Sequence, residues 1–280
     1  MSTATPTPAK PPPPKPSAPS PASSNTGPKR SFTTARATAL GGQKVVIYGP
    51  GGVGKTELCK SLETVNVFPL FVDVEAGAGF CGATRVDPIP QTFQEVRDVL
   101  HDTSIWKEFS AVVIDSLTKL EELVTQHVIL NVKHEKGHKI GGIEDYGFGK
   151  GYVHTYEAFQ LFLSDLDALQ RQGKHIICVC HDCTANVPNP SGEDWIRYEP
   201  RLQASKAASI RHRVKEWCDH LLYVGYDVAV NNDGKGVGGG TRTIYPMEMP
   251  AHWAKSRKLS RTIPYGKGSP DLWNQLFSKE

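Results

Sequence analysis

The stretch GPGGVGKT, residues 49–56, decides how this chain of 280 residues is interpreted. It matches the pattern G-x-x-x-x-G-K-[ST], follows the apolar run KVVIY (44–48) and leads into an amphipathic stretch over 57–62, which is the context this pattern requires. Glycines let such a loop turn tightly and direct its amides at phosphate oxygens, and the following helix adds a partial positive charge. The stretch predicts a nucleoside-triphosphate site formed by Gly49, Pro50, Gly51, Gly52, Val53, Gly54, Lys55 and Thr56.

Three side chains in this region have expected tasks. Lys55 can reach the β and γ phosphates, and the Thr56 hydroxyl can ligate Mg²⁺. The run AVVID (111–115) is an apolar strand that ends in a carboxylate, about sixty residues after the loop. We therefore expect Asp115 to hold the Mg²⁺ through its water shell.

Short apolar runs alternate with amphipathic stretches from about residue 40 onward. The runs are rich in Val and Ile and almost continuously apolar, which is typical of parallel strands covered on both faces. They predict strands at 44–48, 70–74, 111–115, 175–180 and 221–224. Helices are predicted by a capping box at Thr92 and Glu95 and by apolar stripes over 117–128 and 156–169, the last ending at Gly173. The pattern predicts an α/β fold with a central, mainly parallel sheet flanked by helices.

Residues 1–37 form a separate region by composition. Ten of the 21 prolines fall within residues 1–28, among Ser, Ala, Thr and Lys, so the segment has little apolar surface to offset its ordering entropy. We predict a disordered Pro/Ser/Ala-rich tail over 1–37 and one nucleotide-binding domain over 38–280. The tail is either a solvated spacer or a ligand of the SH3 type.

Charge and composition exclude several classes of protein. The formal net charge is +3, but the first 40 residues carry five cations and no acid, so the remainder is at −2 and does not by itself indicate nucleic-acid binding. No run of 18 apolar residues predicts a transmembrane helix, and no apolar N-terminal segment predicts a secretory signal. Six cysteines are too few for a disulfide scaffold. We expect a reduced, cytoplasmic protein without membrane contact.

The cluster Cys178, Cys180, His181 and Cys183 has the composition of a metal site but not its spacing. The pattern C-x-C-H-x-C matches no common structural zinc pattern, and Cys178 and Cys180 alternate along a predicted strand, so both face the same side. We expect cysteines that pack as small apolar residues, and no structural zinc.

Three strand ends carry a resemblance to a known family. The segments FVDVEAG (71–77), AVVIDSL (111–117) and ICVCHD (177–182) resemble successive strand ends of the RecA-like recombinases. Together with YEPRLQASKAA (198–208) and AKSRKLSRTIP (254–264), they look most like the phage nucleotide-binding proteins, which are RecA-like single-strand annealing proteins. The resemblance covers roughly residues 40–275. It implies a RecA-like P-loop ATPase domain over 38–280 that uses ATP and Mg²⁺.

The resemblance implies roles for two further residues. Glu75 corresponds to the glutamate that activates the hydrolytic water, on a strand expected beside the one that ends at Asp115. The alternative is that Glu75 caps a loop or pairs with a nearby arginine such as Arg85. His181 takes the place of a γ-phosphate sensor, on a strand expected between those of the P-loop and Asp115. RecA has an amide side chain there, so a structural histidine is the alternative.

Two stretches are candidates for contact with single-stranded DNA. Residues 134–152 combine six glycines, three lysines and three aromatic residues, and bases stack on aromatic rings without sequence preference. Residues 184–213 take the place of the second DNA-binding loop that the resemblance implies. Their cations are Arg197, Arg201, Lys206, Arg211 and Arg213. From composition alone, both stretches read as ordinary solvated loops.

Residues 249–270 carry five cations and no acid. In RecA-like ATPases that form rings or filaments, cations of the neighbouring subunit complete the site and stabilise charge on the transferred phosphoryl group. Lys255 and Arg257 are the candidates for this role in trans, and the resemblance thus implies self-association into a ring or filament. A surface patch and a third DNA contact are the alternatives.

The expected function is ATP hydrolysis, stimulated by single-stranded DNA, in annealing or recombination. One alternative is a small-molecule kinase, which would not need a carboxylate such as Glu75 placed for water. The other is a nucleotide-dependent scaffold or loader without significant turnover, which would bind a partner protein through the proline-rich tail. Hydrolysis without an acceptor excludes the kinase, and deletion of residues 1–35 tests the scaffold.

Overall fold

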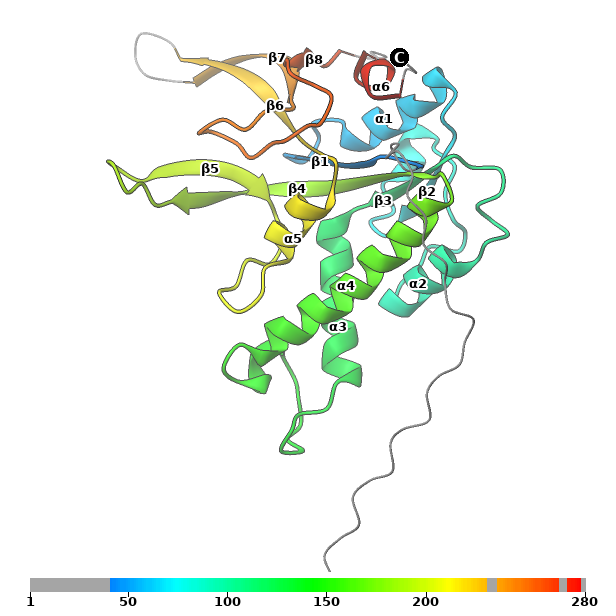
Figure 1. Ribbon diagram of the computed structural model, residues 1–280, viewed down its shortest axis with the longest axis vertical. Coiled ribbons are helices and arrows are strands. Elements are labelled where there is room, and N and C mark those ends of the chain that lie inside the picture. The colour runs from blue at the N-terminus through cyan, green and yellow to red at the C-terminus, as the bar shows by residue number, and fades with distance from the viewer. Residues whose placement is uncertain (1–40, 231–235, 267–270, 278–280) are drawn as a thin grey trace, which may run out of the picture. The chain divides into compact units, whose positions relative to one another are not determined.

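A sheet of eight strands organises the part of the chain that the structure describes, residues 41–230, 236–266 and 271–277 of a computed structural model (Figure 1). Five of these strands are parallel and lie side by side in the order β2-β3-β4-β1-β6. They are β1 (Lys44–Gly49), β2 (Pro69–Asp73), β3 (Ala111–Asp115), β4 (His175–Val187) and β6 (His220–Val230). All five predicted strands are confirmed, and so is the predicted α/β fold.

Three further strands are antiparallel to their neighbours. They are β5 (Trp195–Pro200), β7 (Gly236–Tyr245) and β8 (Ile263–Pro264). Strand β7 pairs with β6 and β8 pairs with β7, so they continue the main sheet beyond its parallel part. Strand β5 pairs with the outer half of β4, from Asp182 to Val187. The sequence analysis did not predict these three strands.

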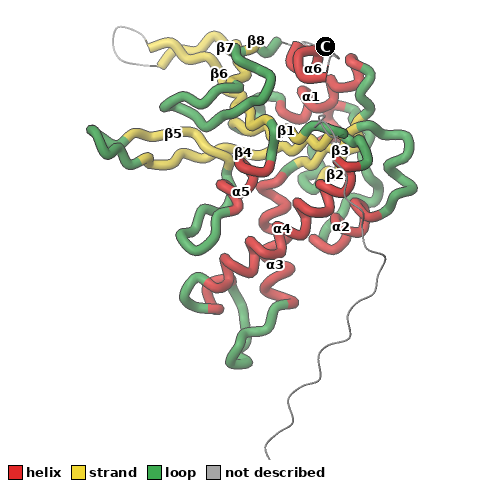
Figure 2. Tube along the Cα trace, in the orientation of Figure 1, coloured by secondary structure: helices red, strands yellow, loops and turns green. Residues whose placement is uncertain are grey.

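Helices cover both faces of the sheet (Figures 1 and 2). Four of them pack with the sheet into one apolar core, and α1 and α6 pack into a second core on the opposite face. The six α-helices within the described residues are α1 (Lys55–Lys60), α2 (Phe93–His101), α3 (Leu117–Asn131), α4 (Lys150–Arg171), α5 (Ile210–Trp217) and α6 (Asp271–Phe277). Short 3₁₀ turns lie at Ser61–Val65, Ala78–Cys81 and Ile143–Tyr146. Because both faces are covered, the parallel strands are almost entirely apolar.

Local signals in the sequence set the ends of two helices. The Thr92 hydroxyl accepts a hydrogen bond from the Glu95 amide (3.2 Å), and the Glu95 carboxylate accepts one from the Thr92 amide (3.1 Å). This reciprocal pair is the predicted capping box, and α2 begins directly after it. Helix α4 ends just before Gly173, whose φ of +91° is the left-handed conformation typical of a helix C-terminus.

The stretch 134–152 is only partly a loop. Its 3₁₀ turn Ile143–Tyr146 buries the Tyr146 ring, whose hydroxyl donates to the carbonyls of Val128 (2.9 Å) and Val132 (2.7 Å) at the end of α3. Helix α4 then begins at Lys150. The prediction of a loop was therefore wrong for residues 143–152, because the buried Tyr146 anchors this part of the stretch to α3.

The stretch 184–213 is also only partly a loop. It contains the end of β4, all of β5 and the start of α5. Charge pairing stabilises it, because the buried Glu199 carboxylate accepts from Arg197 (2.5 Å) and Arg211 (2.7 Å). The prediction of a second loop was therefore wrong for the strand and helix residues, because β5 pairs with β4 and the Glu199–Arg211 ion pair joins β5 to α5.

Cys178 and Cys180 are buried in the same apolar core, as their alternation along the strand predicts. All six cysteines are free thiols. In the described ranges, no group of three or more His, Cys, Asp or Glu side chains is placed to hold a metal ion. No helix in those ranges is long and apolar enough to cross a membrane. The predicted tail over 1–37 lies outside them.

Candidate nucleotide-binding site

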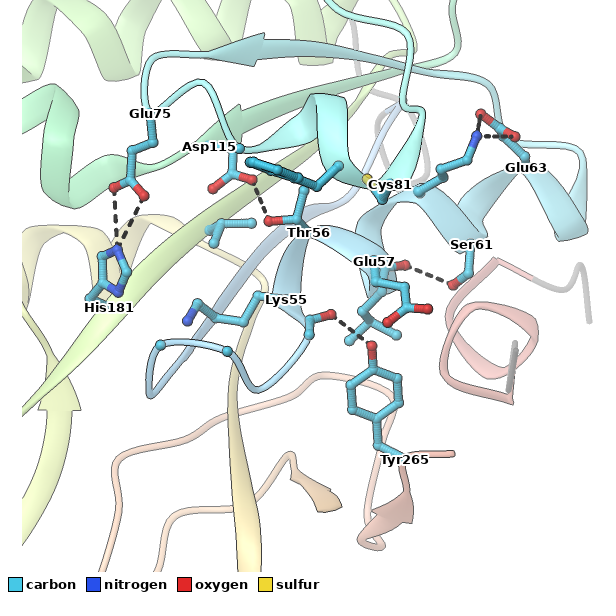
Figure 3. A pocket seen from close by; sticks show the side chains of 18 of the residues that line it. Lys55, Thr56, Glu57, Ser61, Glu63, Glu75, Cys81, Asp115, His181 and Tyr265 are labelled. Atoms are coloured by element: carbon cyan, nitrogen blue, oxygen red, sulfur yellow. Dashed lines mark hydrogen bonds and ion pairs between the residues drawn. The ribbon is translucent and has the colours of Figure 1, made fainter. Parts of the chain in front are cut away.

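A cavity of about 720 Å³ opens at the carboxyl ends of the parallel strands (Figure 3). This is the edge at which open α/β sheets bind their ligands. The cavity brings together residues from five separate parts of the sequence. Its polar and aromatic lining side chains include Lys55, Thr56, Glu63, Glu75, Phe80, Cys81, Asp115, His181 and Tyr265.

The loop between β1 and α1 has the geometry of a phosphate cradle. Its Lys55 ammonium is buried and donates to the carbonyls of Gly49 (2.7 Å) and Pro50 (2.8 Å). Burial lowers the pKa of Lys55, and the nearby carboxylates of Asp115 and Asp182 oppose this shift. The ammonium is therefore held inside the loop, where a polyphosphate would replace neutral carbonyl acceptors with charged ones.

The glycines of the loop do not all serve the same purpose. A Cβ atom at Gly49 would lie 2.1 Å from the Val224 carbonyl oxygen of β6, so this position is required by strand packing. Gly52 (φ +77°) and Gly54 (φ +92°) are required by the left-handed backbone. A Cβ atom at Gly51 would meet no atom within 4 Å.

Thr56 and Asp115 meet at the floor of the cavity. The Thr56 hydroxyl donates to the Asp115 carboxylate (2.7 Å), which is buried at the end of β3. Burial raises the pKa of Asp115 to about 6, although the hydrogen bond from Thr56 opposes the shift. A hydroxyl and a carboxylate are the hard oxygen ligands that Mg²⁺ prefers, and a divalent cation would compensate the buried charge. The residues present therefore fit Mg²⁺, as the sequence predicts.

Glu75 lies at the same edge of the sheet, two residues after β2 ends at Asp73. Its carboxylate oxygens are each 3.2 Å from His181 Nε2 and one accepts a hydrogen bond from the Ser116 hydroxyl. The hydrogen bond with His181 lowers the pKa of Glu75, against the effect of partial burial. The carboxylate is therefore ionised and held by two neighbours. The alternative partner, Arg85, instead approaches Asp73 (3.9 Å).

The neighbourhood of these strands agrees with the sequence analysis, with one correction. Strand β2 pairs with β3, so that Asp73 lies opposite Asp115, and β4 lies between β3 and β1. His181 thus lies beside Gly49 in register. However, β4 does not end at His181. It continues to Val187 because β5 supplies a new antiparallel partner where the parallel neighbours stop.

Asp73 is a site residue that the sequence analysis missed. Its buried carboxylate accepts from the backbone amides of Gly77 (3.1 Å) and Ala78 (2.8 Å). These bonds close the loop that carries Glu75 and set its direction. A usable signal was present, because an aspartate two residues before the glutamate ends an otherwise apolar strand.

Three more missed residues hold the phosphate loop from the outside. The Tyr265 hydroxyl donates to the Gly54 carbonyl (2.7 Å), and the Arg242 guanidinium donates to the Val53 carbonyl (2.8 Å) and stacks over the Tyr265 ring at 4.1 Å. The Tyr226 hydroxyl donates to the carbonyl of the preceding residue, Gly52 (3.2 Å). These residues lie at least 174 positions from the loop in the sequence, and no local pattern points to them.

The candidates for a role in trans lie away from this cavity. Lys255 pairs with Leu221 through both backbone hydrogen bonds, and Arg257 lies 3.1 Å from Asp219, which in turn accepts from the amide of Lys44. Lys44 begins β1, whereas the phosphate loop follows its end. Both cations are therefore at the opposite edge of the sheet from the cavity of their own chain.

A family model of an AAA domain matches residues 41–258. The chain belongs to this AAA-domain family. The matched range begins just before β1 and includes the phosphate loop, Glu75, Asp115 and His181, whereas Tyr265, which also lines the cavity, lies beyond it. No match was found among curated proteins. The AAA domain is a P-loop ATPase-type domain, which indicates nucleotide binding.

The AAA domain's cavity assigns a task to each group. Lys55 and the loop amides would hold the phosphates, and Thr56 and Asp115 would hold Mg²⁺, which supplies charge neutralisation at the phosphate oxygens. Phe80 is 98% exposed and lies with Cys81 on the 3₁₀ turn at another part of the wall. The aromatic side chains of Phe80 and Tyr265 thus line the cavity in addition to the polar groups.

Proposed function

We propose that this AAA-domain protein is a RecA-like ATPase of the phage type, which hydrolyses ATP, binds single-stranded DNA and assists annealing or recombination. The observation that supports this best is the position of Glu75. Its ionised carboxylate is beside Asp115 and the phosphate loop, held by Ser116 and His181, at the end of the strand next to the Asp115 strand. A carboxylate so placed suits activation of water rather than recognition of a phosphoryl acceptor.

In this mechanism, the chain's own residues supply positioning and a base. Lys55 and the loop amides hold the phosphates, while Glu75 accepts a proton from the water that attacks the γ phosphorus. The bond from the γ phosphorus to the bridging oxygen then breaks, and ADP carries away the electron pair. Ser116 and His181 keep Glu75 ionised and oriented until the proton arrives.

The proposed contact with single-stranded DNA draws on the exposed cations and aromatic rings of residues 134–152 and 184–213. Arg197 and Arg211, which pair with Glu199, and the buried Tyr146 are not among them. Phe148 supports this part of the proposal, since its ring is fully exposed between two glycines with positive φ. An exposed ring is able to stack on a base without regard to sequence. Nonspecific stacking of this kind suits an annealing protein.

Self-association is the remaining part of the proposal. Lys255 and Arg257 lie at the sheet edge opposite the cavity of their own chain, so they could contribute to hydrolysis only in a neighbouring subunit. We propose a ring or filament in which these cations stabilise charge on the phosphoryl group of the adjacent site.

The test is steady-state ATP hydrolysis with Mg²⁺, with and without single-stranded DNA, at two salt concentrations. We expect DNA to stimulate hydrolysis and the stimulation to weaken at high salt, because counterions compete for phosphate contacts. The Glu75→Gln variant should bind ATP and lose hydrolysis under both conditions. ATP binding without any effect of DNA would overturn the proposed role in annealing, and hydrolysis that requires an acceptor would indicate a kinase.

A further inference from the structure

A second cavity, of about 600 Å³, lies between α4, α5 and the turn that precedes α5. It shares no lining residue with the nucleotide cavity. Its volume exceeds what one phosphate group needs and falls in the range of ordinary ligand sites. The lining residues with charged or hydroxyl side chains are Tyr156, Glu157, Ser205, Lys206, Ser209, His212, Arg213 and Glu216.

Arg213 in this cavity lacks the partners that an arginine normally has. Its Nε atom is buried and makes no hydrogen bond, and its guanidinium forms no ion pair with any residue that the structure describes. A buried donor without an acceptor is costly, and the cost is greater for a charged group. The guanidinium is therefore poised for an acceptor that the described chain does not itself provide.

The other polar groups of the cavity leave this charge uncompensated. Lys206 is exposed, and its ammonium has no hydrogen-bond or ion-pair partner among the described residues. The Glu157 carboxylate is turned to His154 (3.5 Å), and Ser209 and His212 bond to each other (2.6 Å). The cavity thus holds two cations and two carboxylates: Glu157 is engaged by His154, and Glu216 lies one turn beyond Arg213 on α5 without pairing with it. The Arg213 guanidinium, whose Nε has no acceptor, is the group that would receive an anionic ligand.

The neighbouring cations of the same stretch show the contrast. Arg197 and Arg211 are neutralised by the buried Glu199, and Arg197 also lies 3.3 Å from Glu248. The charges of those two arginines are therefore already paired within the folded chain. Arg213, two residues beyond Arg211, carries the same charge without an acid to meet it.

We propose that this cavity is a phosphate-binding subsite in which the Arg213 guanidinium and the Lys206 ammonium hold a phosphate group. Resting on the proposed function, we assign that phosphate to the backbone of single-stranded DNA, and a free polyphosphate is the other source of the same chemistry. A guanidinium suits this ligand because its planar set of donors matches two phosphate oxygens at once.

The first test measures the affinity for a fluorescent oligonucleotide, (dT)₃₀, by anisotropy over a series of salt concentrations. Arg213→Ala should weaken binding about 10-fold or more and make the salt dependence shallower by about one unit. Arg213→Lys should lose less, because it keeps the charge, and Lys206→Ala should also lose less. Arg171→Ala, which removes an exposed arginine at the other end of α4, is the matched control and should bind as the parent does. Parental affinity and salt dependence in Arg213→Ala would overturn the assignment to DNA.

A second test separates this subsite from the proposed function. In a Lys55→Ala background, which disables the phosphate loop, pyrophosphate should raise the melting temperature, and Arg213→Ala should abolish that rise. If the parent binds no DNA but this effect is present, the DNA function fails and the phosphate subsite stands for a free polyphosphate. If pyrophosphate raises the melting temperature of the Lys55→Ala variant and of the Lys55→Ala/Arg213→Ala variant equally, or of neither, the proposed subsite is overturned.

The melting temperature distinguishes an arginine that serves a ligand from one that stabilises the fold. Arg213→Met should be as stable as the parent or more stable, because the substitution removes a buried donor that has no acceptor. A marked fall in melting temperature would mean that the folded chain uses the guanidinium itself, and would overturn the proposal. This variant also keeps the binding test valid should the alanine variant fold poorly.

Discussion

The parallel and antiparallel parts of the sheet make different contributions to the nucleotide cavity. The parallel strands bring to one edge of the sheet the groups that would meet the nucleotide and its metal, namely Glu75, Asp115 and His181. The antiparallel extension provides no such group but holds the phosphate loop by its carbonyls, through Arg242 and, just after β8, Tyr265. The comparison teaches that chemistry and support come from separate parts of the sheet, and that each can be removed separately.

The largest effect is expected from the phosphate loop itself. Lys55→Ala should reduce ATP hydrolysis on the order of 100-fold or more, since it removes the cation that the loop holds for the phosphates. Binding of a fluorescent ATP analogue and release of phosphate measure this loss. Lys119→Ala, in an exposed ion pair with Glu122, is the control and should behave as the parent. Unchanged turnover in Lys55→Ala would show that the cavity is not the nucleotide site.

The carboxylate of the parallel part comes next. Glu75→Gln should retain ATP binding and slow turnover by about 10²- to 10⁴-fold, the usual contribution of a positioned base. Glu63→Gln changes a second carboxylate that lines the cavity but pairs with Lys60, and it should leave turnover nearly unchanged. Parental turnover in Glu75→Gln would return Glu75 to a structural role.

A smaller effect is expected from the antiparallel part. Tyr265→Phe leaves the Gly54 carbonyl without its donor, which costs about 1 kcal/mol, or about 5-fold. The loss should fall mainly on KM for ATP rather than on kcat, because the side chain positions the loop and takes no part in proton transfer. A collapse of kcat as deep as that of Glu75→Gln would break the distinction between the two parts.

The smallest effect concerns pH and the opposite edge of the parallel strands. Burial lowers the pKa of His175 and of His220 to about 4, at the starts of β4 and β6. The unfolded chain, with pKa values near 6.5, therefore binds more protons between pH 6.5 and pH 4. The stability that these neutral histidines contribute is complete above pH 6.5 and is lost as the pH falls through this window.

Melting temperatures at pH 7 and pH 5 measure this loss, which should amount to a few degrees. His220→Gln should flatten the pH dependence, since glutamine does not titrate and can still bond to Ser256 or Gln43. An exposed histidine, His138, supplies the control, because its replacement should leave the pH profile unchanged. A parental slope in His220→Gln would show that other groups carry the acid sensitivity.

The sequence was informative where structure depends on local pattern. The continuous apolar runs predicted every parallel strand. The strand-final Asp115 after a phosphate loop was expected to hold Mg²⁺ together with Thr56, and the two side chains lie within hydrogen-bond distance of each other. Those features depend on burial of both sheet faces and on a short motif, and both are visible in a single sequence. The neighbourhood of Glu75 and His181 followed from the strand order that the family resemblance implies.

The remainder depends on partners that are distant in the sequence. Strand β7, GVGGGTRTIY, is rich in glycine and offers no apolar alternation over its first half, so only its pairing with β6 reveals it. The outer half of β4, HDCTANV, pairs its backbone with β5 and is only partly buried, so most of its side chains are polar. Arg242 and Tyr265 have no local signal, since their role arises only when the hairpin folds over the loop.

The close approach of Gly49 to the Val224 carbonyl has a practical consequence for anyone who randomises the codons of this loop. Variants at position 49 push two core strands apart, so they should vanish from the library at the stage of soluble expression, before any ligand is offered. Variants at position 51 meet open space and should survive that stage, to be sorted only when the library is challenged for nucleotide. Within one motif, substitution of position 49 is thus expected to affect folding, and substitution of position 51 is expected to affect only ligand binding.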